Sequence, residues 1–228
     1  IFASILLGIG MLKLVIEVGK LVGNRVSGGA AFPAIVGSGI VASVMGQAVA
    51  NVVLTGRLTI PMMKNRGFSP NMAGAIEAVA STSGQIMPPV LGLAGFIIAV
   101  FLNVPYMDVA LAGLIPALLF LSGATIGVLS SAKRSRIPRL QEPVDSTVVK
   151  RLLPSFIISF GVVLVLLLGY YSPSYAGLCG IGVALFVCLF QKEHRPTRKE
   201  LLDSFYDGLT LVTLLSLLLI AVGPLAQT

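Results

Sequence analysis

The sequence predicts an all-α polytopic membrane protein. Of its 228 residues, 56% are hydrophobic and 11% are charged, whereas soluble domains carry about 25% charged residues. The mean hydropathy of the chain is +0.97. Its charged residues gather between long apolar runs, which is where the loops of a helical membrane protein lie. These observations together favour several membrane-spanning helices over a soluble fold.

The net charge of +7 is explained by membrane topology. Basic residues between spans mark cytoplasmic loops, and no basic face is combined with a soluble fold, as nucleic-acid binding would require. We therefore expect no nucleic-acid partner. Cys179 and Cys188 lie within one apolar run and the sole histidine, His194, lies in a charged loop, so neither a disulfide nor a metal cluster is expected.

The first segment predicts the end of a spanning helix followed by a helix in the membrane interface. Ile1–Leu12 is apolar, and this start without a methionine indicates an internal piece of a longer protein. Met11–Asn24 follows. It carries Lys13, Glu17 and Lys20 at spacings that place all three on one helical face. Its other face is apolar, as in helices that lie in the interface plane.

Two interpretations fit residues 29–66. The first part, Gly29–Gly56, is uncharged and longer than the about 20 residues that one span needs. It is also rich in Gly and Ala and holds Gln47 and Asn51. One interpretation is a single long helix with a polar patch. The other, which we favour, is a re-entrant hairpin with its tip near Met45–Asn51, because basic residues flank both of its ends.

Residues 69–102 predict a helix that is broken inside the membrane. Ser69 is the expected N-cap and Pro70 the first helical residue. The first half runs to about Thr82, and the second half resumes at Val90. The break contains Pro88-Pro89, and each proline removes a backbone donor and crowds the carbonyl four residues back.

A break of this kind predicts a binding site. Unpaired carbonyls in hydrocarbon cost several kcal/mol each, so broken backbone is tolerated only against protein or around a water-filled site. A proline kink is the simpler alternative, but the preceding Ser81-Thr82-Ser83-Gly84-Gln85, with four polar side chains, fits it poorly. Unwound carbonyls with hydroxyl or amide oxygens offer the hard ligands that sodium takes, and half-helix ends complement a bound ion.

Four further polar residues are candidates for the same site. Gln47 and Asn51 lie four apart and share a helical face, although hydrogen bonding between helices explains such residues equally well. Glu77 and Arg57 are ionisable residues within apolar runs, and such residues usually face a cavity or each other. Glu77 either tunes an ion site or pairs with Arg57. Arg57 either contacts an anionic substrate or extends to the membrane interface.

Basic clusters orient the predicted spans. Residues 109–132 form an uninterrupted span, and the loop 133–151 carries six basic and two acidic residues, which places it in the cytoplasm. Counting back through the span puts Asn103–Asp108 outside. The broken helix then starts inside, next to Arg66, in agreement with the basic flanks of the hairpin.

Residues 152–228 predict further transmembrane helices. The expected spans are Leu152–Tyr171, Ala176–Phe190 and a third that begins at Leu201, with the charged loop Gln191–Glu200 before it. No GxxxxGK[ST] phosphate loop and no catalytic constellation appears in the sequence. We therefore expect neither an enzyme nor an ATPase, and any pumping would draw on an ion gradient.

Several short runs carry a resemblance to a known family. They are Gly37-Ser38-Gly39, Ala48-Val49-Ala50-Asn51-Val52-Val53, Thr55-Gly56, Thr59-Ile60-Pro61, Lys64, Arg66-Gly67, Ala73-Gly74-Ala75-Ile76-Glu77-Ala78 and Ser81-Thr82-Ser83-Gly84-Gln85-Ile86-Met87-Pro88-Pro89-Val90-Leu91-Gly92. The chain resembles the large membrane subunit of TRAP transporters, most closely the fused permeases that work with TAXI-type binding proteins. The match is dense over about Gly28–Tyr106 and diffuse afterwards.

This resemblance implies an elevator-type secondary transporter with two inverted repeats, each bearing a re-entrant hairpin and a broken helix. Residues 1–132 would form the first repeat, and 152–228 would lead into the second. It implies sodium-coupled uptake of an organic acid across a bacterial or archaeal cytoplasmic (inner) membrane. The implied partners are a periplasmic TAXI-type substrate-binding protein and a small four-helix membrane subunit, separate or fused N-terminally.

The resemblance also implies one sodium site that joins the hairpin tip to the unwound carbonyls. Its residues here are Asn51, Gly84, Met87 and Pro89, with the neighbours Ile86 and Pro88, and local chemistry adds Ser83. The chain departs from the family at the tip, where Met45-Gly46-Gln47 replaces a frequent Ser-Gly-Ser, and at Arg57, where a small or apolar residue is usual.

Two alternatives remain open from the sequence. One is another ion-coupled symporter with hairpin architecture, driven by protons through Glu77. The other is a non-transporting scaffold subunit of a membrane assembly.

Overall fold

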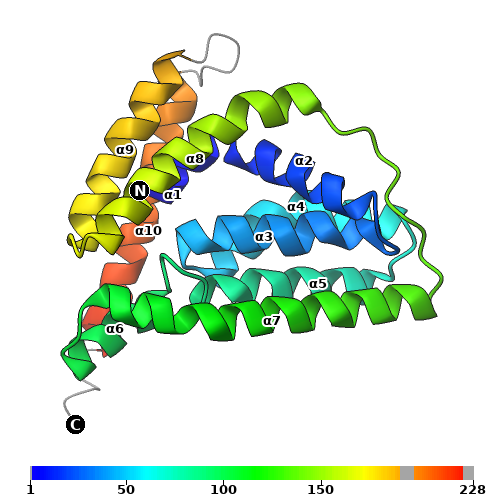
Figure 1. The fold of residues 1–228 in the computed structure, drawn as a ribbon, viewed down its shortest axis with the longest axis horizontal. Coiled ribbons are helices and arrows are strands. Elements are labelled where there is room, and N and C mark those ends of the chain that lie inside the picture. Colours follow the sequence, from blue (N-terminus) through cyan, green and yellow to red (C-terminus); the bar gives the residue numbers. More distant parts are fainter. Residues whose placement is uncertain (1, 191–197, 223–228) are drawn as a thin grey trace.

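The computed structural model describes residues 2–190 and 198–222, and these residues form helices, turns and loops (Figure 1). The all-α prediction is therefore confirmed for them. The predicted loop residues 191–197, with His194, lie outside the described residues. In chain order the elements are α1 Phe2–Gly8, α2 Met11–Gly23, η1 Gly29–Ala31, α3 Phe32–Met45, α4 Ala48–Asn65, α5 Pro70–Thr82, η2 Ser83–Gln85, α6 Leu93–Leu102, α7 Tyr106–Arg134, α8 Ser146–Leu168, α9 Pro173–Phe190 and α10 Arg198–Val222.

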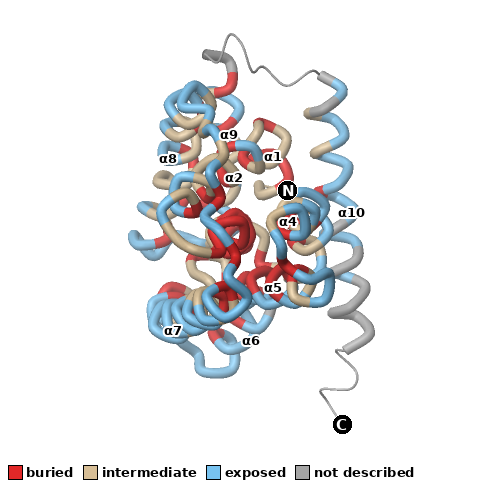
Figure 2. Tube along the Cα trace, turned by 90° about the vertical axis from the view of Figure 1, so that its right-hand side faces the viewer, coloured by how far each residue is buried: buried red, intermediate tan, exposed pale blue. Residues whose placement is uncertain are grey.

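Helix α3 occupies the centre of the molecule. It packs against α2 on one side and against α4 and α5 on the other, and α7 follows alongside α5 (Figure 1). Helices α8, α9 and α10 gather with α1 at one end. The buried residues, drawn in red, are concentrated around α3 in the middle of the molecule (Figure 2). Helix α7 and the described side chains of α10 are largely exposed. The fold therefore surrounds α3, which carries no charged side chain, with helices that cover it.

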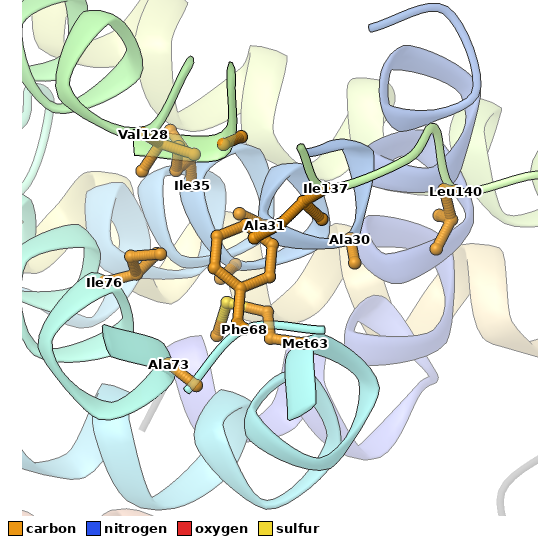
Figure 3. Close-up of a cluster of buried hydrophobic side chains, with 12 residues drawn as sticks. Ala30, Ala31, Ile35, Met63, Phe68, Ala73, Ile76, Val128, Ile137 and Leu140 are labelled. Atoms are coloured by element: carbon orange, nitrogen blue, oxygen red, sulfur yellow. The ribbon is translucent and has the colours of Figure 1, made fainter. Parts of the chain in front are cut away.

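The largest cluster of buried side chains joins the start of α3, the end of α4, the first half of α5 and the end of α7 (Figure 3). Phe68 lies at its middle, 3% exposed, next to Ala31 and Met63. Small residues such as Ala31 and Ala73 let the helices approach this ring. Burying a phenylalanine side chain contributes about 1.5–3 kcal/mol. The cluster therefore fixes the end of the molecule opposite to the turn between α3 and α4.

Helix α2 lies exceptionally close to the start of the α3 segment. A methyl group on Gly19 would overlap the backbone of Pro33, and one on Gly23 would overlap the carbonyl oxygen of Gly29. Lys20 on this helix donates to Glu17 at 2.9 Å, as the predicted shared face requires. The first helix ends at Gly8 rather than at the predicted Leu12, because the chain turns at Gly10, whose φ is +106°.

Helices α7 and α8 are long and apolar enough to cross a membrane. Only 11% and 22% of their most apolar stretches are buried in the described structure. A helix in the core of a soluble protein would be mostly covered by its own chain, so these side chains face another surrounding. Together with the composition, this exposure indicates contact with lipid or with further protein.

Four helices begin earlier than the sequence predicts, and at two of these starts a side chain caps the helix. Helix α8 begins at Ser146 rather than Leu152, since the Asp145 side chain accepts from the backbone of Thr147 and Val148. The loop 133–151 is shortened accordingly. Helix α9 begins at Pro173 rather than Ala176, behind Ser172. Helices α7 and α10 also begin earlier, at Tyr106 rather than 109 and at Arg198 rather than Leu201, and no side-chain hydrogen bond caps the start of α7.

Candidate functional site

Helices α3 and α4 form a hairpin. The chain turns at Gly46-Gln47, and Gly46 has a left-handed φ of +65°, which favours glycine. Across the hairpin, the Asn51 side-chain amide donates to the carbonyl oxygen of Ser38 at 3.0 Å. A single long helix therefore does not describe this segment. The turn lies within the tip predicted near Met45–Asn51.

The predicted break is present after α5. Ser69 caps this helix by accepting from the Met72 backbone, and the helix ends at Thr82, both as the sequence indicates. A short 3-10 turn, η2, follows, and regular α-helix resumes at Leu93 rather than at the predicted Val90. The reason is that the Val90 and Gly92 backbone amides bond outside a helix, to Ser43 and Gln85.

The hairpin tip and the break lie side by side. The Val90 amide donates to the Ser43 carbonyl oxygen at 3.3 Å. A methyl group on Gly84 would lie 2.8 Å from Ala42 Cβ, and one on Gly92 would lie 2.8 Å from the carbonyl oxygen of Gly46. The two polar segments singled out in the sequence thus meet, and glycine allows their backbones to come together.

Asn51 is the most informative side chain in this region. It is fully buried, and its Nδ2 donates to Ser38. Its Oδ1 is buried and has no hydrogen-bond partner among the described residues. Buried polar atoms in native proteins nearly always have a partner, so an unpaired one calls for an explanation such as a bound ion or water. An amide oxygen is a suitable ligand for a hard cation.

The other predicted sodium ligands lie in or next to the break. Ser83 and Gly84 are buried in η2, and the Ser83 hydroxyl donates to the Ala80 carbonyl oxygen at 2.6 Å, so its oxygen still has lone pairs to offer. Pro89 is buried. Three neighbours, Ile86, Met87 and Pro88, are partly buried. These candidate ligands are hydroxyl, amide and backbone carbonyl oxygens. Such neutral oxygens are suitable ligands for a sodium ion.

The substrate and tuning candidates are not all brought together. Gln47 is partly buried and Gln85 is exposed, and both line a cavity of about 980 Å³ beside the hairpin tip. Asp207 and Thr210 of α10 line its other side. Arg57 is exposed on α4 and is not among the residues that line this cavity.

Glu77 is fully buried, and its pairing with Arg57 is wrong. The Glu77 carboxylate accepts instead from hydroxyl groups on three helices, with Ser38 at 2.9 Å and Ser81 at 3.1 Å. Thr55 and Thr59 also donate to it. The reason is geometric, since Glu77 points from α5 into the space between the hairpin arms while Arg57 faces outward.

Tyr106 is a residue of this region that the sequence analysis missed. Its hydroxyl donates to the Pro89 carbonyl oxygen at 2.8 Å and accepts from the Leu91 amide at 3.1 Å. Its ring stacks on Phe96 with ring centroids 4.3 Å apart. The sequence predicted Tyr106 in the loop before the span 109–132, and nothing in that loop indicated which carbonyl its phenol would reach.

Comparisons with known proteins identify the family of the chain. Residues 1–228 match the family described as the DctM component of tripartite ATP-independent periplasmic transporters. The chain is 28% identical over 200 residues to a TRAP transporter large permease protein of Haemophilus influenzae Rd, covering 83% of this chain and 45% of that protein.

Two further relatives are TRAP permeases. The 2,3-diketo-L-gulonate TRAP transporter large permease of Escherichia coli K12 is 26% identical over 184 residues, which is 78% of this chain and 42% of that protein. The sialic acid TRAP transporter permease of Haemophilus influenzae 86-028NP is 24% identical over 220 residues, 93% and 35% respectively. The chain therefore spans less than half the length of each relative. No solved structure matches it. Because the family matches the whole chain, residues 1–228, the chain belongs to the DctM family of TRAP transporter large permeases.

Proposed function

We propose that this chain is part of a sodium-coupled secondary transporter that imports a small organic acid delivered by a periplasmic binding protein. The observation that carries the proposal is the unpaired, fully buried Oδ1 of Asn51 at the tip of a helical hairpin. This tip lies against a broken helix, and the two together offer neutral oxygens of the kind that sodium takes.

The residues that would hold sodium are those at the meeting of tip and break. Asn51 would contribute its side-chain oxygen, and Gly84, Met87 and Pro89 their backbone carbonyls, with Ile86 and Pro88 as neighbours. The Ser83 hydroxyl is a further candidate ligand. A bound sodium ion would neutralise the partial negative charge of these oxygens, so its binding would stabilise the contact between tip and break.

The wider assembly follows from the family. We infer a multi-pass protein of the cytoplasmic (inner) membrane with α2 in the interface and a re-entrant α3–α4 hairpin. Residues 1–132 would form the first of two inverted repeats of an elevator-type transporter, and 152–228 would lead into the second. A TAXI-type periplasmic binding protein and a small four-helix membrane subunit, separate or fused N-terminally, would complete it. We propose the cavity lined by Gln47 and Gln85 as the substrate site, because their side-chain amides can donate to a carboxylate.

The experiment is uptake into proteoliposomes that contain the full-length permease, with its binding protein and a panel of radiolabelled small carboxylates. One arm has an inward sodium gradient and the other an inward proton gradient in choline buffer. We expect uptake only in the sodium arm. Equal uptake in both arms contradicts sodium coupling, and no uptake of any carboxylate contradicts the substrate class.

Proton coupling is the second candidate function, because Glu77 is a fully buried carboxylate. Under this alternative, uptake follows the proton gradient, and Glu77→Gln abolishes the pH dependence of uptake. Under sodium coupling, Glu77→Gln changes the response to sodium instead. A scaffold without transport would show uptake in neither arm.

A further inference from the structure

Ser38 contacts both the buried carboxylate of Glu77 and the side-chain amide of Asn51, and Thr55 contacts the same carboxylate and the Asn51 backbone. We propose that Glu77 is a positioning residue for the cation site and acts on Asn51 through Ser38 and Thr55. This inference rests on the proposed function, because it assigns a role toward the sodium ion that Asn51 would bind.

Ser38 contacts both groups at once. Its hydroxyl donates to Glu77 Oε1 at 2.9 Å, and its backbone carbonyl oxygen accepts from Asn51 Nδ2 at 3.0 Å. Thr55 makes the second link. Its hydroxyl contacts Glu77 Oε1 and lies 2.8 Å from the backbone carbonyl oxygen of Asn51. The Ser38 and Thr55 hydroxyls are 3.0 Å apart. All four residues are 0–1% exposed, so water does not compete for these bonds.

This arrangement decides where the free amide oxygen of Asn51 points. A side-chain amide has one donor end and one acceptor end. The donor end is held by the Ser38 carbonyl, so Oδ1 is turned away from it and left unpaired. Ser38 is in turn held by Glu77 from α5, the helix that leads into the break. Glu77 therefore ties the orientation of the hairpin ligand to the segment that carries the carbonyl ligands.

The charge of Glu77 gives it a second effect on a cation. Among the described residues, Glu77 receives hydroxyl donors and forms no ion pair, unlike Glu17 and Glu142. A buried carboxylate without a cationic partner is costly. A cation held by Asn51 on the neighbouring hairpin would reduce this cost, since charge interactions weaken slowly in a protein interior. By reciprocity, the carboxylate raises the affinity for the cation.

A purely structural role makes a different prediction. Glutamine has nearly the shape of glutamate, and its amide oxygen still accepts hydroxyl hydrogen bonds. If Glu77 only filled space and held the helices together, Glu77→Gln would leave sodium binding unchanged. The positioning role requires that the loss of charge lowers sodium affinity in a protein that is still folded.

The test is calorimetric titration of sodium chloride into the full-length permease in nanodiscs, in choline chloride at constant ionic strength and without substrate. We expect Glu77→Gln to weaken sodium binding about tenfold, within the usual range of coupling between sites. Glu77→Asp keeps the charge and should recover part of the affinity. Ser159→Ala, a buried serine on α8, is the control for loss of a buried hydroxyl elsewhere.

A second pair of variants tests the route through Ser38. Ser38→Ala removes a hydroxyl that links Glu77 to the Asn51 partner, whereas Ser81→Ala removes one that contacts Glu77 alone. We expect the larger loss of sodium affinity from Ser38→Ala. If Glu77→Gln does not yield monodisperse protein, this pair decides the question, and equal affinities in the two variants overturn the proposal.

The remaining outcomes separate this proposal from the proposed function. A wild-type permease that binds sodium, with Glu77→Gln binding it equally well, overturns the positioning role alone. A wild-type permease that binds no sodium overturns the proposed function, and the positioning role with it.

Discussion

The Tyr106 hydroxyl donates a 2.8 Å hydrogen bond to the carbonyl oxygen of Pro89, the last residue of the double proline. The same hydroxyl accepts from Leu91, so one phenol spans two residues of the broken segment. The bond joins the start of α7 to the middle of the break. It leaves the Pro89 carbonyl one lone pair for a second partner and fixes the direction in which that lone pair points.

We therefore predict that Tyr106→Phe weakens sodium binding severalfold. The variant keeps the ring stacked on Phe96 but releases the Pro89 carbonyl, and losing one hydrogen bond costs about 0.5–1.5 kcal/mol. Sodium titration and thermal unfolding of the full-length permease measure the two effects. Tyr206→Phe, which changes an exposed tyrosine of α10, is the matched control. Sodium affinity equal in both variants would remove Tyr106 from the support of the site.

Asn51→Ala is predicted to weaken sodium binding more than it lowers expression. The change removes the unpaired oxygen, which would be a ligand, together with one buried hydrogen bond to Ser38. We expect a loss of sodium affinity of about tenfold or more, as for removal of a charge-assisted contact. Calorimetric titration measures the affinity, and the yield of monodisperse protein measures expression. An unaltered affinity excludes Asn51 as a ligand.

A third prediction concerns the close approach of the break to α3. In Gly84→Ala the new methyl group would lie 2.8 Å from Ala42 Cβ, so one of the backbones must shift, which costs about 1–3 kcal/mol. Gly74→Ala on α5 meets nothing within 4 Å and should stabilise the helix by about 0.5–1 kcal/mol. Thermal unfolding of the two variants should move in opposite directions. Parallel shifts would show that the approach of Gly84 to α3 does not limit packing.

The fourth prediction concerns the loop between α7 and α8. Asn24 donates to the Glu142 carbonyl oxygen at 2.8 Å and accepts from the Glu142 amide at 3.2 Å. The Glu142 side chain makes partly exposed ion pairs with Lys20 and Arg66, and such pairs contribute only about 0–1 kcal/mol. Asn24→Ala should therefore loosen the loop more than Glu142→Gln does.

Limited trypsin digestion measures this difference, because Arg139 is exposed within the loop. We expect faster cleavage there in Asn24→Ala than in Glu142→Gln at physiological salt. In wild type, raising the salt concentration should change the cleavage rate little, since the backbone bonds are not screened. Faster cleavage in Glu142→Gln than in Asn24→Ala would assign the tether to the ion pairs.

Local chemistry explains which parts of the fold were predictable. The helix start at Ser69 and Pro70 depends on neighbouring residues in the sequence, and so does the break at Pro88-Pro89. Both features were therefore predictable from the sequence. The start of α8 was missed although Asp145 caps it, because the apolar run that signals the span begins later. Periodicity indicates where a helix is apolar, and caps determine where it begins.

Contacts between distant segments explain the rest. The Tyr106–Pro89 bond and the hydroxyl groups around Glu77 come from helices that the sequence does not place in register. Asn51 is a candidate from sequence because an amide inside an apolar run is unusual, whereas its unpaired oxygen depends on the contact with Ser38 in α3. The pairing of Glu77 with Arg57 was wrong because charge alone suggested it, whereas the direction of each side chain on its helix decided the outcome.

The contact between α2 and the start of α3 has a consequence for movement. Gly19 and Gly23 bring the backbone of α2 against Pro33 and Gly29 with no side chain between them, so neither segment can slide past the other without collision. Any displacement of the hairpin across the membrane would carry α2 along as one rigid body. The nearest hinge in the chain is then the turn at Gly10, between α1 and α2.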